Sequence, residues 1–147
     1  MKNRLPAVVI DIDGVIVKGR SIIGNSPNVI RALLEPYSEH RVNIPFVLMT
    51  NGGGLPEPAK AEDINRRLNL PKEECHGKRK LEGDHMILCH SPLRDPLILD
   101  LYRDKHVIVT GMYEELDVAL YYGYNKAIHV EELAVLYSDQ IPNDLAS

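Results

Sequence analysis

The sequence predicts an α/β protein, with a three-layer Rossmann-like parallel sheet that carries helices on both faces. Two observations lead to this class. Short apolar runs rich in valine and isoleucine recur along the chain, and helix-like segments separate them. Polar or glycine-rich turns follow most of these runs. Strands that alternate with helices need crossover connections, and such connections build parallel sheets.

The length and composition indicate one globular domain over residues 1–147. A chain of 147 residues buries roughly two-thirds of the surface that its unfolded form exposes. Its 44% hydrophobic and 26% charged residues argue against disorder. The two cysteines are too few for a disulfide framework, and no apolar run reaches the length of a membrane span. We therefore expect an intracellular, cytoplasmic protein without a targeting segment.

The first strand and the first helix are marked by clear signals. Leu5–Ile10 is an apolar run without alternation, which is typical of a strand buried on both faces. Asn25-Ser26-Pro27 predicts a helix start, because proline is well tolerated in the first turn. That helix is expected to continue to about Tyr37. Its apolar side would consist of Val29, Ile30, Leu33 and Leu34.

The rest of the chain continues the alternation. Ile44–Met49 predicts the second strand, and Glu57–Leu68 predicts a helix with Ala61, Ile64 and Leu68 on one side. Ser91-Pro92 is expected to cap a further helix. The remaining expected strands are Met86–Cys89, Val107–Val109 and Ala127–Val130, and the remaining expected helices are Glu114–Tyr122 and Glu131–Leu136.

The end of the first strand carries two carboxylates, Asp11 and Asp13, followed by Gly14. Carboxylates so close together repel unless a cation or a proton lies between them. Mg²⁺ with a phosphate as a further ligand suits such a pair. One carboxylate could attack phosphorus to form an aspartyl phosphate, and the other could act as general acid and base.

Two other readings of this acidic pair can be compared with it. A calcium loop of the EF-hand type beginning at Asp11 needs glycine and glutamate where Ile16 and Ile22 stand. Calcium binding of that type is therefore excluded. A solvated turn is the remaining alternative, because aspartate and glycine both favour turns.

The end of the second strand carries Thr50-Asn51-Gly52-Gly53-Gly54. A hydroxyl followed by the exposed N–H groups of a glycine-rich turn can hold an anion. The segment lacks the lysine of a P-loop and does not continue as a dinucleotide fingerprint. In parallel sheets the ligand lies beyond the carboxyl ends of the strands, so this turn is predicted to lie beside the acidic pair.

These two strand ends, in this order, are shared with a known group of hydrolases. The segments that carry the similarity are Asp11-Ile12-Asp13-Gly14-Val15-Ile16-Val17-Lys18-Gly19, Thr50-Asn51-Gly52-Gly53, Ile87-Leu88-Cys89-His90-Ser91-Pro92-Leu93, Val107-Ile108-Val109-Thr110-Gly111 and Gly123-Tyr124. The chain resembles the haloacid dehalogenase superfamily, subfamily IIA, and within it the group named after the cat eye syndrome critical region.

The resemblance implies a Mg²⁺-dependent phosphoric-monoester hydrolase, a phosphatase that works through an aspartyl phosphate. It also allows a mitochondrial location in place of the cytoplasm. Asp11 would be the nucleophile and Asp13 the general acid and base. The Asp13 backbone carbonyl would join Asp11 as a metal ligand. Thr50 and the N–H groups of Asn51 and Gly52 would hold the phosphoryl oxygens.

Two motifs of the family have no clear counterpart. These are a lysine that balances the phosphoryl charge and an acidic pair that completes the metal site. Asp139 with Asp144 imitates the acidic motif, but only Lys126 stands in a place for the lysine. Gly83-Asp84 precedes an apolar strand instead of following one. We therefore expect an N-terminal core portion, truncated before the cap domain and weakly active or inactive.

The expected partner is a small phosphorylated metabolite. The net charge of −4 and the scattered basic residues disfavour nucleic acid, and no segment favours a membrane. A sheet edge left open by truncation would allow self-association. Zinc is disfavoured, since Cys75-His76, His85 and Cys89-His90 lack the usual ligand spacing and Cys89 is expected in the packed core.

Two other functions fit parts of the pattern. A receiver-like signalling domain also has an acidic Mg²⁺ pocket, but it needs its phosphoacceptor aspartate on a middle strand. The third strand here ends in Cys89-His90. A non-catalytic binding or assembly module that retains the hydrolase core is the second alternative, and the missing motifs favour it.

Overall fold

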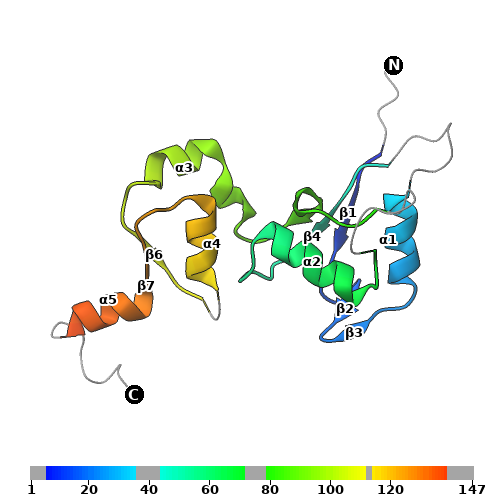
Figure 1. The fold of residues 1–147 in the computed structure, drawn as a ribbon, viewed down its shortest axis with the longest axis horizontal. Helices are drawn as coiled ribbons and strands as arrows, with labels where there is room; N and C mark the ends of the chain where they lie inside the picture. The colour runs from blue at the N-terminus through cyan, green and yellow to red at the C-terminus, as the bar shows by residue number, and fades with distance from the viewer. Residues whose placement is uncertain (1–5, 36–43, 72–78, 112–113, 139–147) are drawn as a thin grey trace. The chain divides into compact units, whose positions relative to one another are not determined.

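A computed structural model describes residues 6–35, 44–71, 79–111 and 114–138. The chain forms two compact units, the first ending at Ser91 and the second beginning at Pro92 (Figure 1). Both contain parallel strands and helices, which confirms the predicted α/β class. Among the described residues, no helix combines the length and the apolar character that a membrane crossing requires.

The first unit contains a parallel sheet of three strands. Its strands are β1 (Val8–Asp11), β4 (Phe46–Met49) and β5 (Met86–Ile87), in the order β1-β4-β5. In the register, Asp11 lies opposite Met49, and Met49 lies opposite Ile87. The carboxyl ends of all three strands therefore meet at one edge of the sheet.

Helices α1 (Ser26–Leu34) and α2 (Glu57–Arg67) pack against this sheet. The predicted apolar residues of the second helix, Ala61, Ile64 and Leu68, are all buried. The first helix is shorter than predicted, because Glu35 is extended. The physical reason is Pro36, since a residue before proline disfavours the helical conformation. The core of the unit consists of Ile12, Ile16, Val17, Ile30, Leu34, Leu48, Ala61, Ile64, Leu68, Leu70, Leu81 and Met86.

The first strand differs from its prediction in burial. Alternate residues of β1 are exposed, and Val9 retains 60% of its accessible surface. An apolar run indicates that the side chains are suited to burial, but it does not indicate whether one face of the strand or both are covered by other elements. The expectation that this strand is buried on both faces is therefore wrong for Val9.

A short antiparallel hairpin follows the acidic pair. It consists of β2 (Val17–Lys18) and β3 (Ser21–Ile22). The Gly14 N–H donates a 2.7 Å hydrogen bond to the Val17 carbonyl. Gly14 has a φ of +92°, a conformation that favours glycine. The hairpin thus turns the chain sharply away from the strand end and leaves the carboxylates at the edge.

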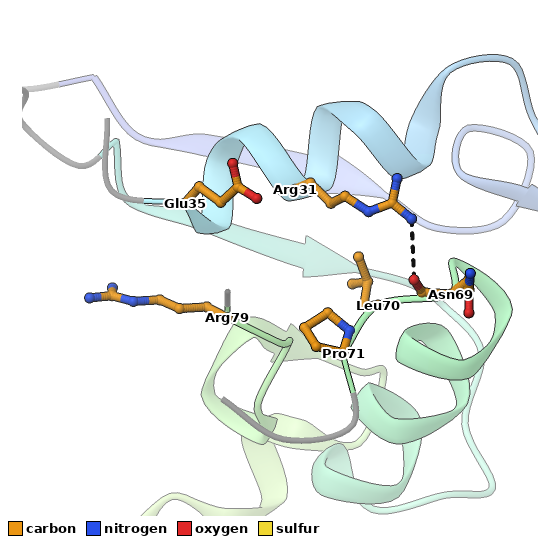
Figure 2. Close-up of a pocket in the computed structure, with 6 residues that line it drawn as sticks. All are labelled: Arg31, Glu35, Asn69, Leu70, Pro71 and Arg79. Atoms are coloured by element: carbon orange, nitrogen blue, oxygen red, sulfur yellow. Dashed lines mark hydrogen bonds between the residues drawn. The ribbon is translucent and has the colours of Figure 1, made fainter. Parts of the chain in front are cut away.

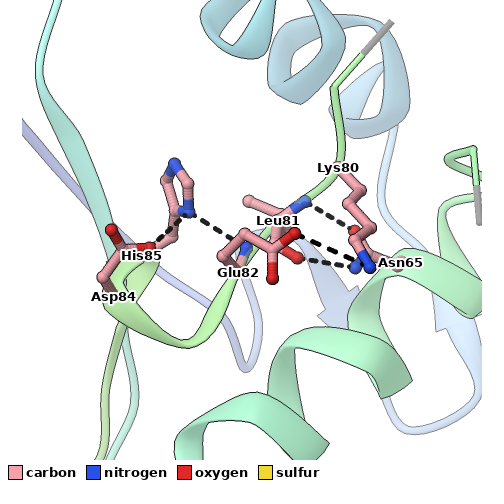
Figure 3. A network of polar contacts seen from close by, with 6 residues as sticks. All are labelled: Asn65, Lys80, Leu81, Glu82, Asp84 and His85. Atoms are coloured by element: carbon pink, nitrogen blue, oxygen red, sulfur yellow. Dashed lines mark hydrogen bonds and ion pairs between the residues drawn. The ribbon is translucent and has the colours of Figure 1, made fainter. Parts of the chain in front are cut away.

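Buried Asn65 ties α2 to the segment that leads into β5 (Figure 3). Its side-chain N–H donates to the Leu81 carbonyl at 2.8 Å, and its oxygen accepts from the Leu81 N–H at 2.9 Å. Next to it, the Glu82 N–H donates to His85 Nδ1 in the 3₁₀ turn η1 (Gly83–His85). The Asn65 side chain thus satisfies both backbone groups of Leu81, which does not belong to a strand.

The second unit is built on a strand–helix–strand crossover. Strands β6 (Val107–Val109) and β7 (Ala127–His129) are parallel, and helix α4 (Glu115–Tyr122) connects them. Helices α3 (Pro96–Tyr102) and α5 (Val130–Leu136) precede and follow them. The core consists of Val118, Ala119, Tyr122 and Tyr124, with Leu99, Val107, Val109 and Ala127 packed against it. The predicted bounds of β6, α4, β7 and α5 are confirmed within two residues.

Two boundaries in the middle of the chain were predicted wrongly. The third strand ends at Ile87, because the Leu88 N–H donates to the Ser91 hydroxyl instead of to a neighbouring strand. Ser91 begins a 3₁₀ turn, η2 (Ser91–Arg94), and does not cap a helix. The cap of α3 is Asp95, whose carboxylate accepts from the Leu97 N–H at 2.8 Å.

Candidate functional site

The acidic pair lies at the carboxyl edge of the first unit's sheet. Asp11 is the last residue of β1, and the Ile12 N–H continues the strand pairing by donating to the Met49 carbonyl at 3.0 Å. Ile12 is completely buried and anchors the strand end in the core. Asp11 and Asp13 on either side of it are exposed. The backbone thus presents both carboxylates at the edge where β4 also ends.

Thr50 joins the second strand end to the acidic pair. Its hydroxyl donates a hydrogen bond of 2.6 Å to Asp13 Oδ2. Its N–H donates to the Ile87 carbonyl at 3.0 Å, which holds Thr50 against β5. The side chain is buried, with 3% of its surface exposed. The predicted proximity of the acidic pair and this turn is therefore confirmed.

Gly52 closes a short relay of hydrogen bonds. Its N–H donates to Thr50 Oγ1 at 2.9 Å, so the Thr50 hydroxyl accepts one bond and donates another. A Cβ atom at Gly52 would lie 3.2 Å from Thr50 Oγ1 and 3.5 Å from Asp13 Oδ2. The close approach accounts for glycine at this position. Asn51, the remaining predicted phosphate-binding residue, is exposed at the tip of the turn.

Gly53 lies against the loop that follows β5. A Cβ atom there would lie 3.1 Å from Cys89 Sγ and 3.2 Å from His90 Cδ2. Cys89 is a free, exposed thiol and not a packed core residue, which corrects the sequence prediction. The reason is the early end of β5, which places Cys89 in the loop.

Sequence reasoning missed a buried polar group beneath the turn. Glu57, the first residue of α2, is completely buried, and the Ser91 hydroxyl donates to its Oε1 at 2.6 Å. The only sequence signals were a glutamate at a helix start and a serine after a strand. Both are common for local structural reasons, and the two residues are far apart in sequence.

His90, in the same loop, is a titratable group whose pKa is shifted. Burial lowers the pKa of His90 below its ordinary value. The Glu57 carboxylate and a hydrogen bond with the Leu55 backbone oppose that shift. The imidazole beside Gly53 is therefore held toward its neutral form.

The donor atoms at the strand ends suit a hard divalent ion in part. Two exposed carboxylates and a backbone carbonyl supply the oxygen ligands that Mg²⁺ prefers. Within the described ranges, no three His, Cys, Asp or Glu side chains cluster as metal ligands do. The residues present thus fit a Mg²⁺ ion as part of its ligand shell, and water would occupy the other coordination positions.

A pocket of about 450 Å³ lies elsewhere in the first unit (Figure 2). It is lined by Arg31, Glu35, Asn69, Leu70, Pro71 and Arg79. The Arg31 guanidinium donates to the Leu68 and Asn69 carbonyls at 3.2 Å, at the carboxyl end of α2. A cation is favourable at that end of a helix, so Arg31 has a structural role here.

The residues considered for the missing motifs are in different situations. Gly83-Asp84 forms the start of η1 before β5, as the sequence indicated. Lys126 is exposed just before β7 in the second unit. Asp139 and Asp144 lie outside the described residues.

Together these features define a class of protein: an α/β core of Rossmann-like type with an acidic pair and a threonine-glycine turn at adjacent ends of parallel strands. The model of the haloacid dehalogenase-like hydrolases matches residues 8–125. The chain belongs to this family.

Two curated relatives are similar to most of the chain. A mitochondrial hydrolase of Saccharomyces cerevisiae is 26% identical over 136 residues, which make up 92% of this chain and 33% of that protein. A fusion protein of Schizosaccharomyces pombe, named as a cardiolipin synthase (CMP-forming) and mitochondrial hydrolase, is 29% identical over 120 residues. Those residues are 80% of this chain and 17% of the fusion protein. The matched part of the chain thus spans a third of the length of the first relative and 17% of the length of the fusion protein.

Proposed function

We propose that this chain carries the nucleophile half of a Mg²⁺-dependent phosphoric-monoester hydrolase site. The observation that supports it most is the 2.6 Å hydrogen bond from the Thr50 hydroxyl to Asp13, beside Asp11 at the same sheet edge. This bond fixes the orientation of one carboxylate and leaves the other exposed toward an incoming group. Orientation and charge placement supply most of the catalysis in phosphoryl transfer.

Each residue has a defined role in this proposal. Asp11 attacks phosphorus as the ester bond breaks, and an aspartyl phosphate forms on its carboxylate. Asp13 gives a proton to the leaving oxygen and then takes one from the attacking water. The Asn51 N–H holds a phosphoryl oxygen. Thr50 and the Gly52 N–H join it when phosphate replaces their present hydrogen bonds to Asp13 Oδ2 and to Thr50 Oγ1. Asp11 and the Asp13 carbonyl would hold Mg²⁺, which neutralises phosphoryl charge.

Full activity would need parts of the site that this chain does not supply. We propose that segments equivalent to the rest of those proteins supply a lysine and further acidic metal ligands. Without that charge compensation, the 147-residue chain should be slower by orders of magnitude, since removing one stabilising donor from an active site typically costs about 100-fold or more. The substrate is proposed to be a small phosphorylated metabolite.

Hydrolysis of p-nitrophenyl phosphate tests this proposal. We expect negligible turnover by the 147-residue chain and clear turnover by a longer form that contains the missing motifs. Asp11→Asn should abolish turnover of the longer form, because the amide is not a nucleophile. Asp104→Asn, which changes an exposed loop carboxylate, is the matched control and should leave turnover unchanged.

One result would reverse the assignment of the missing motif. Brisk Mg²⁺-dependent turnover by the 147-residue chain, lost on Asp139→Asn, would mean that Asp139 supplies the fourth motif. Turnover of the longer form that survives Asp11→Asn would remove Asp11 from the nucleophile's role.

A non-catalytic binding module is the second candidate. It is favoured by one observation: no third acidic side chain joins Asp11 and Asp13 among the described residues. Such a module should bind inorganic phosphate or Mg²⁺ without turnover, even in the longer form. The p-nitrophenyl phosphate assay on that form separates the two candidates.

Self-association is proposed through the open side of β1. Within the described segments, β1 pairs only with β4, and Val9 is exposed on it. Unpaired strand edges readily accept a second chain. Sedimentation at increasing concentration should show dimers, and Val9→Lys should weaken them, because charged residues on an edge strand oppose pairing.

The cellular compartment is proposed to be the mitochondrion rather than the cytoplasm. Both relatives carry the word mitochondrial in their names. Fractionation of cells that express the natural full-length protein tests this, and a purely cytosolic distribution would contradict it.

A further inference from the structure

The first turn of α2 contains a completely buried carboxylate. Glu57 is the first residue of this 11-residue helix, four positions after Gly53. Burial of a carboxylate is costly unless hydrogen bonds satisfy it. Its position at the helix N-terminus helps, because the helix dipole is positive there. The Ser91 hydroxyl contributes a donor at 2.6 Å.

The Ser91 hydroxyl is also part of the loop after β5. It accepts a hydrogen bond of 2.8 Å from the Leu88 N–H, while the Ser91 N–H donates to the Leu88 carbonyl at 3.0 Å. The same oxygen therefore shapes the loop 88–91 and ties it to α2. Ser91 is itself buried, so water does not easily replace these bonds.

This loop forms the wall behind the phosphate-binding turn. Cys89 and His90 lie so close to Gly53 that a single added methyl group would be crowded by both. His90 also has a hydrogen bond with the Leu55 backbone. The turn Thr50–Gly53 thus lies between the acidic pair on one side and the loop 88–91 on the other.

We propose that Ser91 and Glu57 are positioning residues for the phosphate-binding turn. His90 contributes by packing against Gly53, which limits where the Gly53 backbone can lie. The part of this inference that concerns phosphate binding rests on the proposed function, and the part that concerns the position of the turn does not. Neither residue belongs to the strand-end motifs. Their hydrogen bond acts through the loop 88–91, which fixes the backbone whose N–H groups face the anion.

Three variants of the complete chain separate positioning from general stabilisation. Ser91→Ala removes the hydroxyl, and Ser91→Thr retains it. Ser26→Ala is the control, because it removes a serine hydroxyl at the start of α1 that donates to the Ile23 carbonyl and has no bond to Glu57. Two quantities are measured well below the unfolding temperature. They are the ¹H–¹⁵N signals of Asn51, Gly52 and Gly53, and the Kd for inorganic phosphate with Mg²⁺ present.

We expect Ser91→Ala to shift the amide signals of the turn and to weaken phosphate binding by about tenfold, as expected for one lost buried hydrogen bond to a charged group. Ser91→Thr should restore both quantities, and Ser26→Ala should change neither. Turn signals and affinity that match the wild type in Ser91→Ala would overturn the proposal. So would equal effects of Ser91→Ala and Ser26→Ala.

A second experiment tests the contact between His90 and Gly53, and it does not depend on the folding of Ser91→Ala. If Ser91→Ala does not fold, Ser91→Cys, whose thiol is a weaker donor than the hydroxyl, takes its place in the first experiment. Gly53→Ala should shift the Gly52 amide signal, because the new methyl group meets His90. Adding His90→Ala should reduce that shift, whereas adding His85→Ala, at a half-buried histidine of η1, should not. Strict additivity of Gly53→Ala and His90→Ala would overturn the role of the wall.

The two measured quantities, the phosphate Kd and the amide signals of the turn, distinguish this inference from the proposed function. A wild-type chain that shows no phosphate binding would contradict the proposed function. The amide signals of the turn would still decide whether Ser91 and Glu57 position it.

Discussion

The Thr50 hydroxyl donates to Asp13 Oδ2 at 2.6 Å and accepts from the Gly52 N–H at 2.9 Å. One buried hydroxyl therefore links a carboxylate on the first strand end to the glycine turn on the second. Its donor and one acceptor site are both used, so removal of the oxygen would affect both neighbours at once.

Thr50→Val is predicted to remove this link while keeping the side-chain shape. The free energy of unfolding should fall by about 1–3 kcal/mol, because the Gly52 N–H loses its acceptor and Asp13 loses a donor, both in part-buried hydrogen bonds. Thr50→Ser keeps the hydroxyl and should lose less. Urea unfolding of both variants measures the difference. Equal losses for valine and serine would show that the hydroxyl contributes nothing.

Magnesium is predicted to bind weakly. Two carboxylates and one carbonyl leave half of the octahedral positions to water, so we expect a Kd of about 1 mM or weaker. Asp11→Asn should abolish the binding, and Asp104→Asn should not alter it. Calorimetric titration of the complete chain measures this. Tight binding that survives Asp11→Asn would place the ion elsewhere.

Asn65→Ala is predicted to be among the more damaging substitutions in the first unit. It leaves both the N–H and the carbonyl of Leu81 without partners in a buried place, which should cost about 2–4 kcal/mol of unfolding free energy. Asn28→Ala, at an exposed position of α1, should cost about 0.5 kcal/mol or less. Chemical denaturation compares the two. A small effect at Asn65 would mean that the segment around Leu81 finds other partners.

The stability of the chain is predicted to depend on pH through His90. Burial lowers the pKa of His90 in the folded state, so the unfolded chain takes up a proton first as pH falls. The stabilising contribution is complete above the ordinary histidine pKa of 6.5. It declines as pH falls from there toward the folded pKa. His90→Gln should flatten this part of the stability curve.

Titration of the His90 ring by NMR checks the sign directly. The midpoint of the ring's chemical shift should lie below 6.5. A midpoint above that value would mean that Glu57 outweighs the effect of burial.

The class of the fold and the main residues of the candidate site could be predicted from the sequence. Apolar runs and helical periodicity located β4, α2, α4 and β6 to within about two residues, because burial requires those patterns. The pair Asp11 and Asp13 and the Thr50 turn could be placed together before any coordinates. Parallel strands end at the same edge, so adjacent strands bring their carboxyl-terminal residues side by side.

The surroundings of that sheet edge depend on contacts between residues far apart in the sequence. Glu57 and Ser91 meet across 34 positions of sequence, and Asn65 meets Leu81 across 16. The loop of Cys89 and His90 depends on a hydrogen bond that ends β5 early. Local patterns carry no information about such pairs, because each residue alone suits many surroundings. Which buried polar groups satisfy one another is settled only when the packed elements bring their donors and acceptors together.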